Sequence, residues 1–535
     1  MTTGEPARPR RTTWIEVHCK ALRAAGSLTS TAQPGLQHGD AVAVLAADPA
    51  LIAPAVQGVW LAGGSVTMLH QPTRRADLAS WASDTVRTLG MINAKLVLLG
   101  PPFDQLAPLL AQRGISYLML ADLDNPAVRP LSAPVPVDED DTALLQLTSG
   151  SSAEPKAVRI THGNLYANMT AMAQVAALDP GHDVMVSWLP LFHDMGMVGF
   201  LTIPMALGLE LVKVTPADFI SHPLLWAELI SRHHGTITAA PNFGYALLAR
   251  RLANTEERFD LSSLRFALNG AEPIEPAAVR AFTSAGARFG LPETCMVCAY
   301  GMAEATLGVS FAPHGVGMQV DSVDADALET QRRAVIAEPG GSNVREFPRL
   351  GPPLPGLQVR VVDDDGHQVG ERVVGQLQVH GTSVTREYLT TTGLRAAQNA
   401  EGWLDTGDEG YLAEGHVMVC GRRKDVIVMG GRNIYPIDIE RAAGRVQGVR
   451  PGNVAAVRLD VGERRESFAV AVESSRAGDP DAERMLRKEV AARVVDAIGL
   501  RPGAVVVLPP ATLPKTPSGK LRRAALRARI TDHLP

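Results

Sequence analysis

The stretch ALLQLTSGSSAEPK, residues 143–156, joins a short apolar segment to a hydroxyl-rich loop that ends in lysine. Residues 143–147 have the length and apolar character of a buried strand and are bounded by turn residues. The loop after them offers hydroxyl groups, glycine and backbone N–H groups before Lys156, a combination that favours anionic oxygen. It lacks the glycine directly before the lysine, and the Ser or Thr after it, that a P-loop needs. The stretch predicts either a phosphate-binding loop of another kind or an ordinary serine-rich surface loop.

A second lysine-bearing loop lies near the C-terminus, where residues 513–523 read LPKTPSGKLRR. Proline pre-sets the backbone and glycine permits close approach to another surface, so we expect an ordered loop that presents Lys520. A lysine ammonium is a compact cation on a flexible stem, which suits charge that develops on a phosphate and a carboxylate together. Taken alone, the segment is equally consistent with a solvated basic tail.

Four further short motifs lie between these loops: NGAEP at 269–273, YGMAE at 300–304, TGD at 406–408 and GRRKD at 421–425. Each is weak alone, since a stray TGD is normally a turn. In this order, and together with the two loops, they resemble the adenylate-forming enzymes, the superfamily of acyl-CoA synthetases, nonribosomal peptide adenylation domains and luciferases. The resemblance covers nearly the whole chain.

The resemblance implies ATP and Mg²⁺ as cofactors and gives each motif a role. Residues 269–273 would lie against adenine, Tyr300 would stack near the base and Glu304 would hold the metal. Asp408 and Arg422 would contact the ribose, Lys424 would be the hinge between domains, and Lys520 and Glu304 would be the catalytic residues. The implied ATP- or AMP-binding residues are Thr148, Ser149, Gly150, Ser151, Ser152, Lys156, Gly270, Ala271, Glu272, Pro273, Tyr300, Gly301, Met302, Asp408 and Arg422.

Three features resemble one branch of the superfamily, the fatty-acyl-AMP ligases. They are WLPLFHDMGM at 188–197, GRNIYPIDIE at 431–440, and an interval of 351 − 304 = 47 positions between Glu304 and Gly351. The excess, roughly residues 311–347, matches a branch-specific insertion, although a tolerated surface loop would look the same. The branch activates a fatty acid or related carboxylic acid to acyl-adenylate and passes the acyl group to an acyl carrier protein, for polyketide, lipopeptide or complex lipid synthesis.

Other functions remain open. An acyl-CoA synthetase would discharge the same adenylate onto coenzyme A, and a catalytically idle homologue would serve as a binding subunit. An amino-acid-adenylating domain would need an acid for the substrate amine, and no aspartate lies in the expected context. The phosphate loop departs from the family pattern, with Ser152-Ala153 where a Thr-Gly pair is common and Ala157 where glycine usually follows the lysine. The loss of glycines should stiffen the loop and would fit a slower or more specialised enzyme. The segment 68–73 also differs from the family pattern, which puts the substrate in doubt more than the reaction.

The acyl-binding residues implied by the resemblance are Trp188, His193, Asn242 and Phe243. His193 has two interpretations. It would either line the acyl tunnel beside the adenylate, or be a structural histidine hydrogen-bonded to Asp194 or to backbone.

Composition agrees with a large enzyme. The chain has 535 residues, 46% of them hydrophobic and 20% charged, enough for a large core and several domains. A net charge of −5 gives no global attraction to nucleic acid or membrane. The apolar region 184–212 is interrupted by charged residues, Gly and Pro, so we expect no membrane insertion. Four cysteines suggest a reducing, cytoplasmic location, with Cys295 and Cys298 as buried structural thiols.

Strand-length apolar runs alternate with helical stretches, which predicts an α/β fold with mixed, mostly parallel sheets plus a β-rich subdomain. We expect a disordered tail at residues 1–12, a large N-terminal AMP-binding domain at 13–423, and a small mobile α+β domain at 424–535 that carries the catalytic lysine. In detail, we expect a strand at 41–45, a helix over 49–62, and a helix capped by Asn164 that runs to about residue 177.

Overall fold

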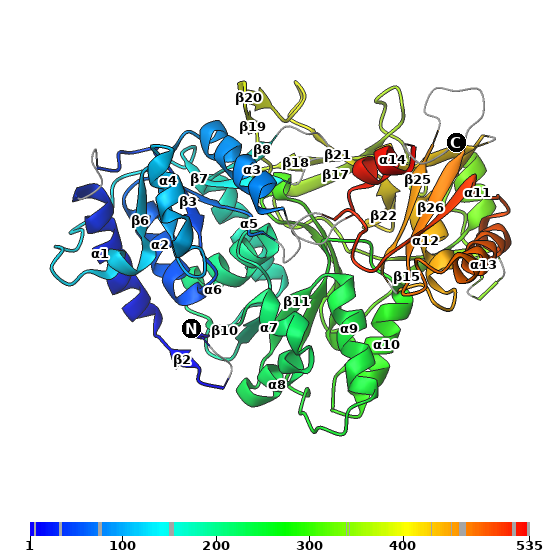
Figure 1. Cartoon of the computed structure of the whole chain (residues 1–535), viewed down its shortest axis with the longest axis horizontal. Helices are drawn as coiled ribbons and strands as arrows, with labels where there is room; N and C mark the ends of the chain where they lie inside the picture. Colours follow the sequence, from blue (N-terminus) through cyan, green and yellow to red (C-terminus); the bar gives the residue numbers. More distant parts are fainter. Residues whose placement is uncertain are drawn as a thin grey trace. The chain divides into compact units, whose positions relative to one another are not determined.

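The computed structural model describes residues 1–4, 7–30, 35–72, 77–148, 155–338, 340–341, 343–429, 431–450, 452–459, 467–515 and 521–531. The chain forms two compact units. Figure 1 shows the chain coloured along its sequence. Unit 1 comprises Met1–Gln319, Leu350–Gln358 and Val379–Leu404, and unit 2 comprises Val320–Arg349, Val359–Gln378 and Asp405–Pro535. These bounds do not coincide with the expected domain boundary at residue 424. The expected hinge motion at that position stays a prediction.

The first sheet of unit 1 has eight strands in the order β20-β19-β8-β7-β4-β3-β5-β6. Neighbours from β7 to β6 are parallel, whereas β8, β19 and β20 add antiparallel strands at the other edge. Every residue of β3 is buried, as expected for a parallel strand covered on both faces. The strands are β3 (Ala41–Leu45), β4 (Ser65–Met68), β5 (Ala94–Leu99), β6 (Tyr117–Met119), β7 (Thr142–Thr148), β8 (Lys156–Thr161), β19 (Glu387–Thr390) and β20 (Gly393–Ala396).

The second sheet of unit 1 also has eight strands, in the order β14-β13-β12-β11-β9-β10-β1-β2. The six strands from β13 to β1 are parallel. The carboxyl ends of parallel strands meet at one edge of a sheet, which is where α/β folds bind ligands. The strands are β1 (Thr2–Thr3), β2 (Arg10–Arg11), β9 (Val184–Ser187), β10 (Glu210–Lys213), β11 (Ile237–Ala240), β12 (Phe266–Asn269), β13 (Met296–Gly301) and β14 (Gly308–Phe311).

The helices of unit 1 begin at recognisable signals. In α2, Asp48 accepts a hydrogen bond from the backbone N–H of Ala50 and Pro49 occupies the first turn, so the expected helix is confirmed. The expected cap of α5 is wrong, because Thr161 is the N-cap and Asn164 is its partner three residues later in a capping box. The longer helices are α1 (Trp14–Ser30), α2 (Pro49–Leu61), α3 (Leu78–Met91), α5 (His162–Val175), α8 (Leu224–His233), α9 (Asn242–Ala253) and α10 (Pro276–Ala287).

The first residues of the chain form strands instead of the expected disordered tail. Thr2 pairs in parallel with Val212 of β10, and β1 pairs antiparallel with β2. Met1 is buried, and its amino group donates to the carbonyl of Thr12 at 2.7 Å. The edge of β10 would otherwise present unpaired backbone groups, and these short strands satisfy them.

Unit 2 contains most of a four-stranded sheet, ordered β17-β18-β21-β22, and a three-stranded sheet, ordered β25-β26-β27. Helices α12 and α13 pack with the second of these sheets around an apolar core that includes Ile439, Val470 and Val490. This part has the expected α+β character. Its elements include β17 (Leu357–Val362), β18 (Gly375–Gly381), β21 (Leu404–Ala413), β22 (His416–Arg422), β25 (Val454–Arg458), β26 (Phe468–Glu473), β27 (Ala504–Leu508), α12 (Pro436–Gly444), α13 (Pro480–Ile498) and α14 (Arg523–Thr531).

The expected insertion at about 311–347 has regular structure. Within unit 2 it forms β15 (Val320–Asp324), α11 (Ala325–Gln331) and β16 (Val344–Pro348), and β15 pairs antiparallel with β16. Across the described parts of the chain, none of the helices has the length and apolar character needed to cross a membrane.

Candidate active site

The expected phosphate loop connects two paired strands. Thr148 ends β7, Lys156 begins β8, and these two residues are antiparallel partners. The Oγ1 atom of Thr148 is buried and has no hydrogen-bond partner among the described residues. Buried hydroxyls normally have partners, so this atom is suited to a ligand. Ser149, Gly150, Ser151 and Ser152 lie outside the described residues.

Lys156, Glu304 and Tyr388 converge beside this loop. The Lys156 Nζ lies 3.8 Å from Glu304 Oε1 and 3.9 Å from the centroid of the Tyr388 ring. The Tyr388 hydroxyl donates to the same carboxylate oxygen at 3.1 Å. The backbone N–H of Thr385 donates to the Glu304 carbonyl at 2.8 Å, which fixes the short turn that carries the carboxylate. An ammonium, a carboxylate and a phenol group therefore lie next to one another in unit 1.

Tyr388 is a site residue that sequence reasoning missed. It lies on β19, opposite Val158 of β8, and only this pairing of distant segments brings it to Lys156. The segment that carries it has no recognisable motif of its own. A strand prediction for residues 387–390 would have been the only available signal.

The segment expected against adenine follows β12. At Gly270 an added Cβ would lie 3.1 Å from the carbonyl oxygen of Ala299 on β13, so the backbone passes close to its neighbour. Ala271 has a positive φ of 68°, and Pro273 follows Glu272 in the turn. A Glu272 carboxylate oxygen accepts from the backbone N–H of Phe243 at 2.7 Å. This segment is therefore tied to the first turn of α9, where two of the four expected acyl residues, Asn242 and Phe243, lie.

Asn242 and Asn269 form a buried amide pair at the carboxyl ends of β11 and β12. The Asn269 Nδ2 donates to Asn242 Oδ1 at 3.3 Å, and the backbone N–H of Glu275 donates to the same oxygen at 3.1 Å. The Asn269 Oδ1 is buried without a partner among the described residues. The pair leaves an acceptor available at the strand ends.

The third expected nucleotide segment ends β13. An added Cβ on Gly301 would lie 2.3 Å from the carbonyl oxygen of Leu307, so only glycine fits. The backbone N–H of Met302 donates to the same carbonyl at 2.8 Å. The Tyr300 hydroxyl lies 3.9 Å from the sulfur of Met302. These contacts fix the turn that leads to Glu304.

Trp188 belongs to an aromatic cluster just beyond β9. Its ring stacks on Phe219 with centroids 4.1 Å apart and meets Phe243 edge-on at 5.9 Å. Two of the expected acyl residues, Trp188 and Phe243, are therefore in contact, and 38% of Phe243 is exposed. The indole N–H of Trp188 is buried and lacks a partner among the described residues.

His193 makes the contact expected of a structural histidine. Its Nδ1 lies 2.6 Å from an Asp194 carboxylate oxygen. A second histidine, His70, was not expected here; its ring meets Phe192 edge-on at 5.6 Å. Burial, with a smaller contribution from the charge of His193, lowers the pKa of His70 to about 4. His70 is therefore neutral at physiological pH, while both interpretations of His193 stay open.

In unit 2, Asp408 and Arg422 are antiparallel partners on β21 and β22. The Arg422 Nε lies 3.0 Å from the Asp408 carboxylate, and the guanidinium also donates to the Thr406 carbonyl at 3.0 Å. The structure thus places these two residues side by side, and their ribose contact stays a prediction. Lys424 is exposed on the short turn Arg423–Asp425, and Lys520 lies outside the described residues.

Residues 4–389 match the family of AMP-binding enzymes. The chain belongs to this family. It is 56% identical to the putative ligase Rv1013 of Mycobacterium tuberculosis, over 98% of this chain and 95% of that protein. It is 31% identical to the long-chain-fatty-acid–AMP ligase FadD26 of Mycobacterium marinum, over 96% and 90% of the two chains.

The chain is also similar to a ligase that acts with an acyl carrier protein and to a solved structure. A medium-chain-fatty-acid–[acyl-carrier-protein] ligase, JamA of Moorena producens, is 34% identical over 74% of this chain and 69% of its own. A solved structure from work on fatty acyl-adenylate ligases of E. coli and L. pneumophila matches with a TM-score of 0.87 and 32% identity, over 97% of this chain and 92% of that one.

These similarities confirm the predicted fold class and the adenylate-forming ligase family, with fatty-acyl-AMP ligases among the relatives. The protein is a ligase that activates carboxylic acids, and its family uses ATP. The roles of individual residues remain predictions.

Proposed function

We propose that this enzyme activates a fatty acid or related carboxylic acid with ATP to acyl-adenylate, and then transfers the acyl group to an acyl carrier protein. The observation that carries the proposal is the convergence of Lys156, Glu304 and Tyr388 beside the Thr148 hydroxyl, which has no partner among the described residues. The names of the ligases FadD26 and JamA support the fatty acid as substrate, and that of JamA supports the carrier.

The chemistry follows from charge. A substrate carboxylate oxygen attacks the α-phosphorus of ATP, the α–β phosphoanhydride bond breaks, and pyrophosphate leaves. Both partners are anionic, so the protein must offset repulsion and align the groups. Lys156 and the loop from Thr148 would hold the outer phosphates, and Lys520 would meet the charge that grows between carboxylate and α-phosphate. No covalent nucleophile is needed.

Magnesium fits the residues present. Mg²⁺ prefers oxygen ligands and usually takes one or two carboxylates from protein together with substrate phosphates. The Glu304 side chain is 15% exposed, and it is held in place by Tyr388 and Lys156. Glu304 would bind the ion, which would offset phosphate charge. The Lys156 Nζ lies 3.8 Å from Glu304 Oε1. With Glu304 engaged by the ion, Lys156 would be available to the phosphates.

We expect the enzyme, given ATP, Mg²⁺ and a fatty acid, to accumulate acyl-AMP and make little acyl-CoA when coenzyme A is added. The reason is the insertion at about 311–347 together with the two branch-specific signatures. Mass spectrometry of the products with and without coenzyme A, and with an acyl carrier protein whose prosthetic thiol is free, measures this. Robust acyl-CoA turnover would instead place the enzyme with the acyl-CoA synthetases.

A further inference from the structure

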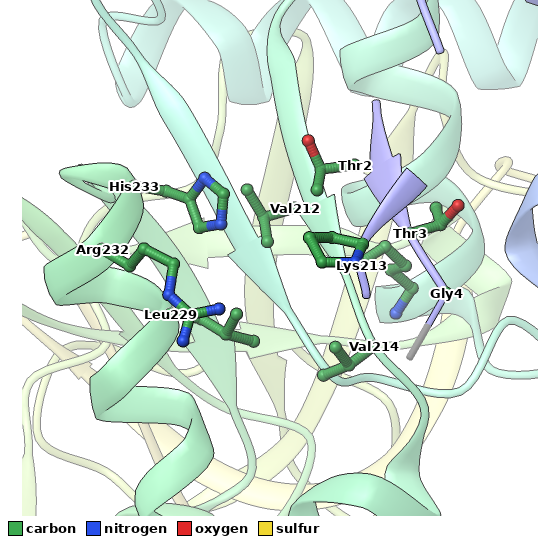
Figure 2. Close-up of a pocket in the computed structure, with 10 residues that line it drawn as sticks. Thr2, Thr3, Gly4, Val212, Lys213, Val214, Leu229, Arg232 and His233 are labelled. Carbon is green, nitrogen blue, oxygen red and sulfur yellow. The ribbon is translucent and has the colours of Figure 1, made fainter. Parts of the chain in front are cut away.

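Lys213 is a fully buried lysine at the carboxyl end of β10. Only 1% of the residue is exposed, and it is the parallel partner of Ser187 at the end of β9. Figure 2 shows it at a small pocket, between the first residues of the chain and helix α8. None of the family motifs includes it.

The Lys213 ammonium joins a closed set of hydrogen bonds around the start of the acyl-site motif. Its Nζ donates to the Ser187 hydroxyl at 3.2 Å and to the carbonyl oxygen of Leu189. The Ser187 hydroxyl accepts from the backbone N–H of Leu189 at 3.1 Å. The backbone N–H of Val214 donates to the Ser187 carbonyl at 3.0 Å. The residues on both sides of Trp188 are thereby fixed to β10.

A lysine here is costly for stability. Removing an ammonium from water costs several kcal/mol unless it is paired, and no carboxylate among the described residues forms an ion pair with it. The titratable groups described at the same pocket, Arg232 and His233 of α8, are bases, so they offer no negative charge to Lys213. The nearby β10 carboxylate, Glu210, pairs with Arg11. Burial lowers the pKa of Lys213 to about 7.

An apolar side chain such as methionine would fill the same space without this cost. Residues that break a local rule in this way are expected at functional positions. The backbone that follows Leu189 is also closely packed. A Cβ on Gly196 would lie 2.0 Å from the Pro190 carbonyl oxygen, so the loop after Trp188 packs directly on the helix Met195–Thr202.

We propose that Lys213 is a positioning residue for the acyl substrate, which fixes the backbone from Ser187 to Leu189 and so sets the place of Trp188 against Phe219 and Phe243. The inference rests on the proposed function, because it assigns Trp188 to the acyl site. Lys213 itself would not touch substrate or ATP, because its amine is engaged by Ser187 and Leu189.

The test is acid-dependent ATP–pyrophosphate exchange in Lys213→Met, with KM measured separately for the fatty acid and for ATP. We expect the KM for the acid to rise about 10-fold, because the buried Ser187 hydroxyl and Leu189 carbonyl lose their donor, with the KM for ATP unchanged. Ser187→Ala removes only the linking hydroxyl and should raise the same constant by a smaller factor. Lys20→Met, which removes a lysine paired with Asp124 at the surface, should change neither.

The split between the two constants excludes a merely structural role, since partial unfolding would lower kcat without selecting the acid. An unchanged acid KM in folded Lys213→Met, or equal rises for acid and ATP, would overturn the inference. If Lys213→Met fails to fold, an unchanged KM for the acid in Ser187→Ala would overturn the inference. Absence of exchange in the wild-type enzyme with every acid would instead overturn the proposed function, and this inference with it.

Discussion

Replacing Lys520 by alanine is expected to slow acyl-adenylate formation by about 10²–10³-fold. The reason is that one preorganised positive charge at a developing oxyanion would be lost. We expect the loop that carries Lys520 to be exposed, so folding should be unchanged. Single-turnover formation of acyl-AMP, followed by mass spectrometry at saturating ATP and acid, gives the rate directly. Binding of ATP should be much less affected than the chemical step.

Lys515→Ala is the matched control from the same loop. Its amine is already held within the unit, since Nζ donates to Asn453 Oδ1 at 2.9 Å and to the Gly452 carbonyl at 3.3 Å. We expect this variant to form acyl-AMP at close to the wild-type rate. A near wild-type rate in Lys520→Ala, with Lys515→Ala unchanged as well, would show that the central residue assignment is wrong.

The second large effect is expected at Lys424. In the proposed function, adenylation would need Lys520 at the site, whereas a carrier thiol would later have to reach the same carbonyl. A single backbone position that absorbs the change is the simplest solution. Lys424→Pro fixes φ and disfavours the helical region at Arg423. Because Lys424 is exposed on the short 3-10 helix Arg423–Asp425, the strain should be confined to this turn. We expect the variant to keep adenylation and lose acyl transfer.

Lys424→Ala, which removes the side chain but leaves φ free, should retain both half-reactions. Separate assays of acyl-AMP formation and of transfer to a carrier protein distinguish the two variants. Equal loss of both steps in folded Lys424→Pro, or loss of neither, contradicts the hinge.

Local patterns predicted much of the fold. The strand at 41–45 and the helix that follows were predictable because a short apolar run, Asp48 and Pro49 all lie within a few residues of one another. The motif residues at the ends of β9, β11, β12 and β13 were predictable for a related reason. Parallel strands place their carboxyl ends at one edge, so motifs far apart in sequence meet there.

Contacts that depend on non-local pairing were not predictable. Tyr388 reaches Lys156 only because β19 pairs with β8, and the chain start becomes a strand only because β10 has an open edge. Lys213 is 1% exposed, and its contacts with Ser187 and Leu189 become visible only when β10 pairs with β9. These contacts reflect tertiary packing, for which a single sequence carries no periodic signal.

The most direct test of the central claim is ATP–pyrophosphate exchange measured over a panel of carboxylic acids. If the enzyme forms acyl-adenylates from fatty acids, radiolabelled pyrophosphate should enter ATP when a fatty acid and Mg²⁺ are present, and should not do so without the acid. Folded protein that gives no exchange with any fatty acid would contradict the account and favour a catalytically idle homologue.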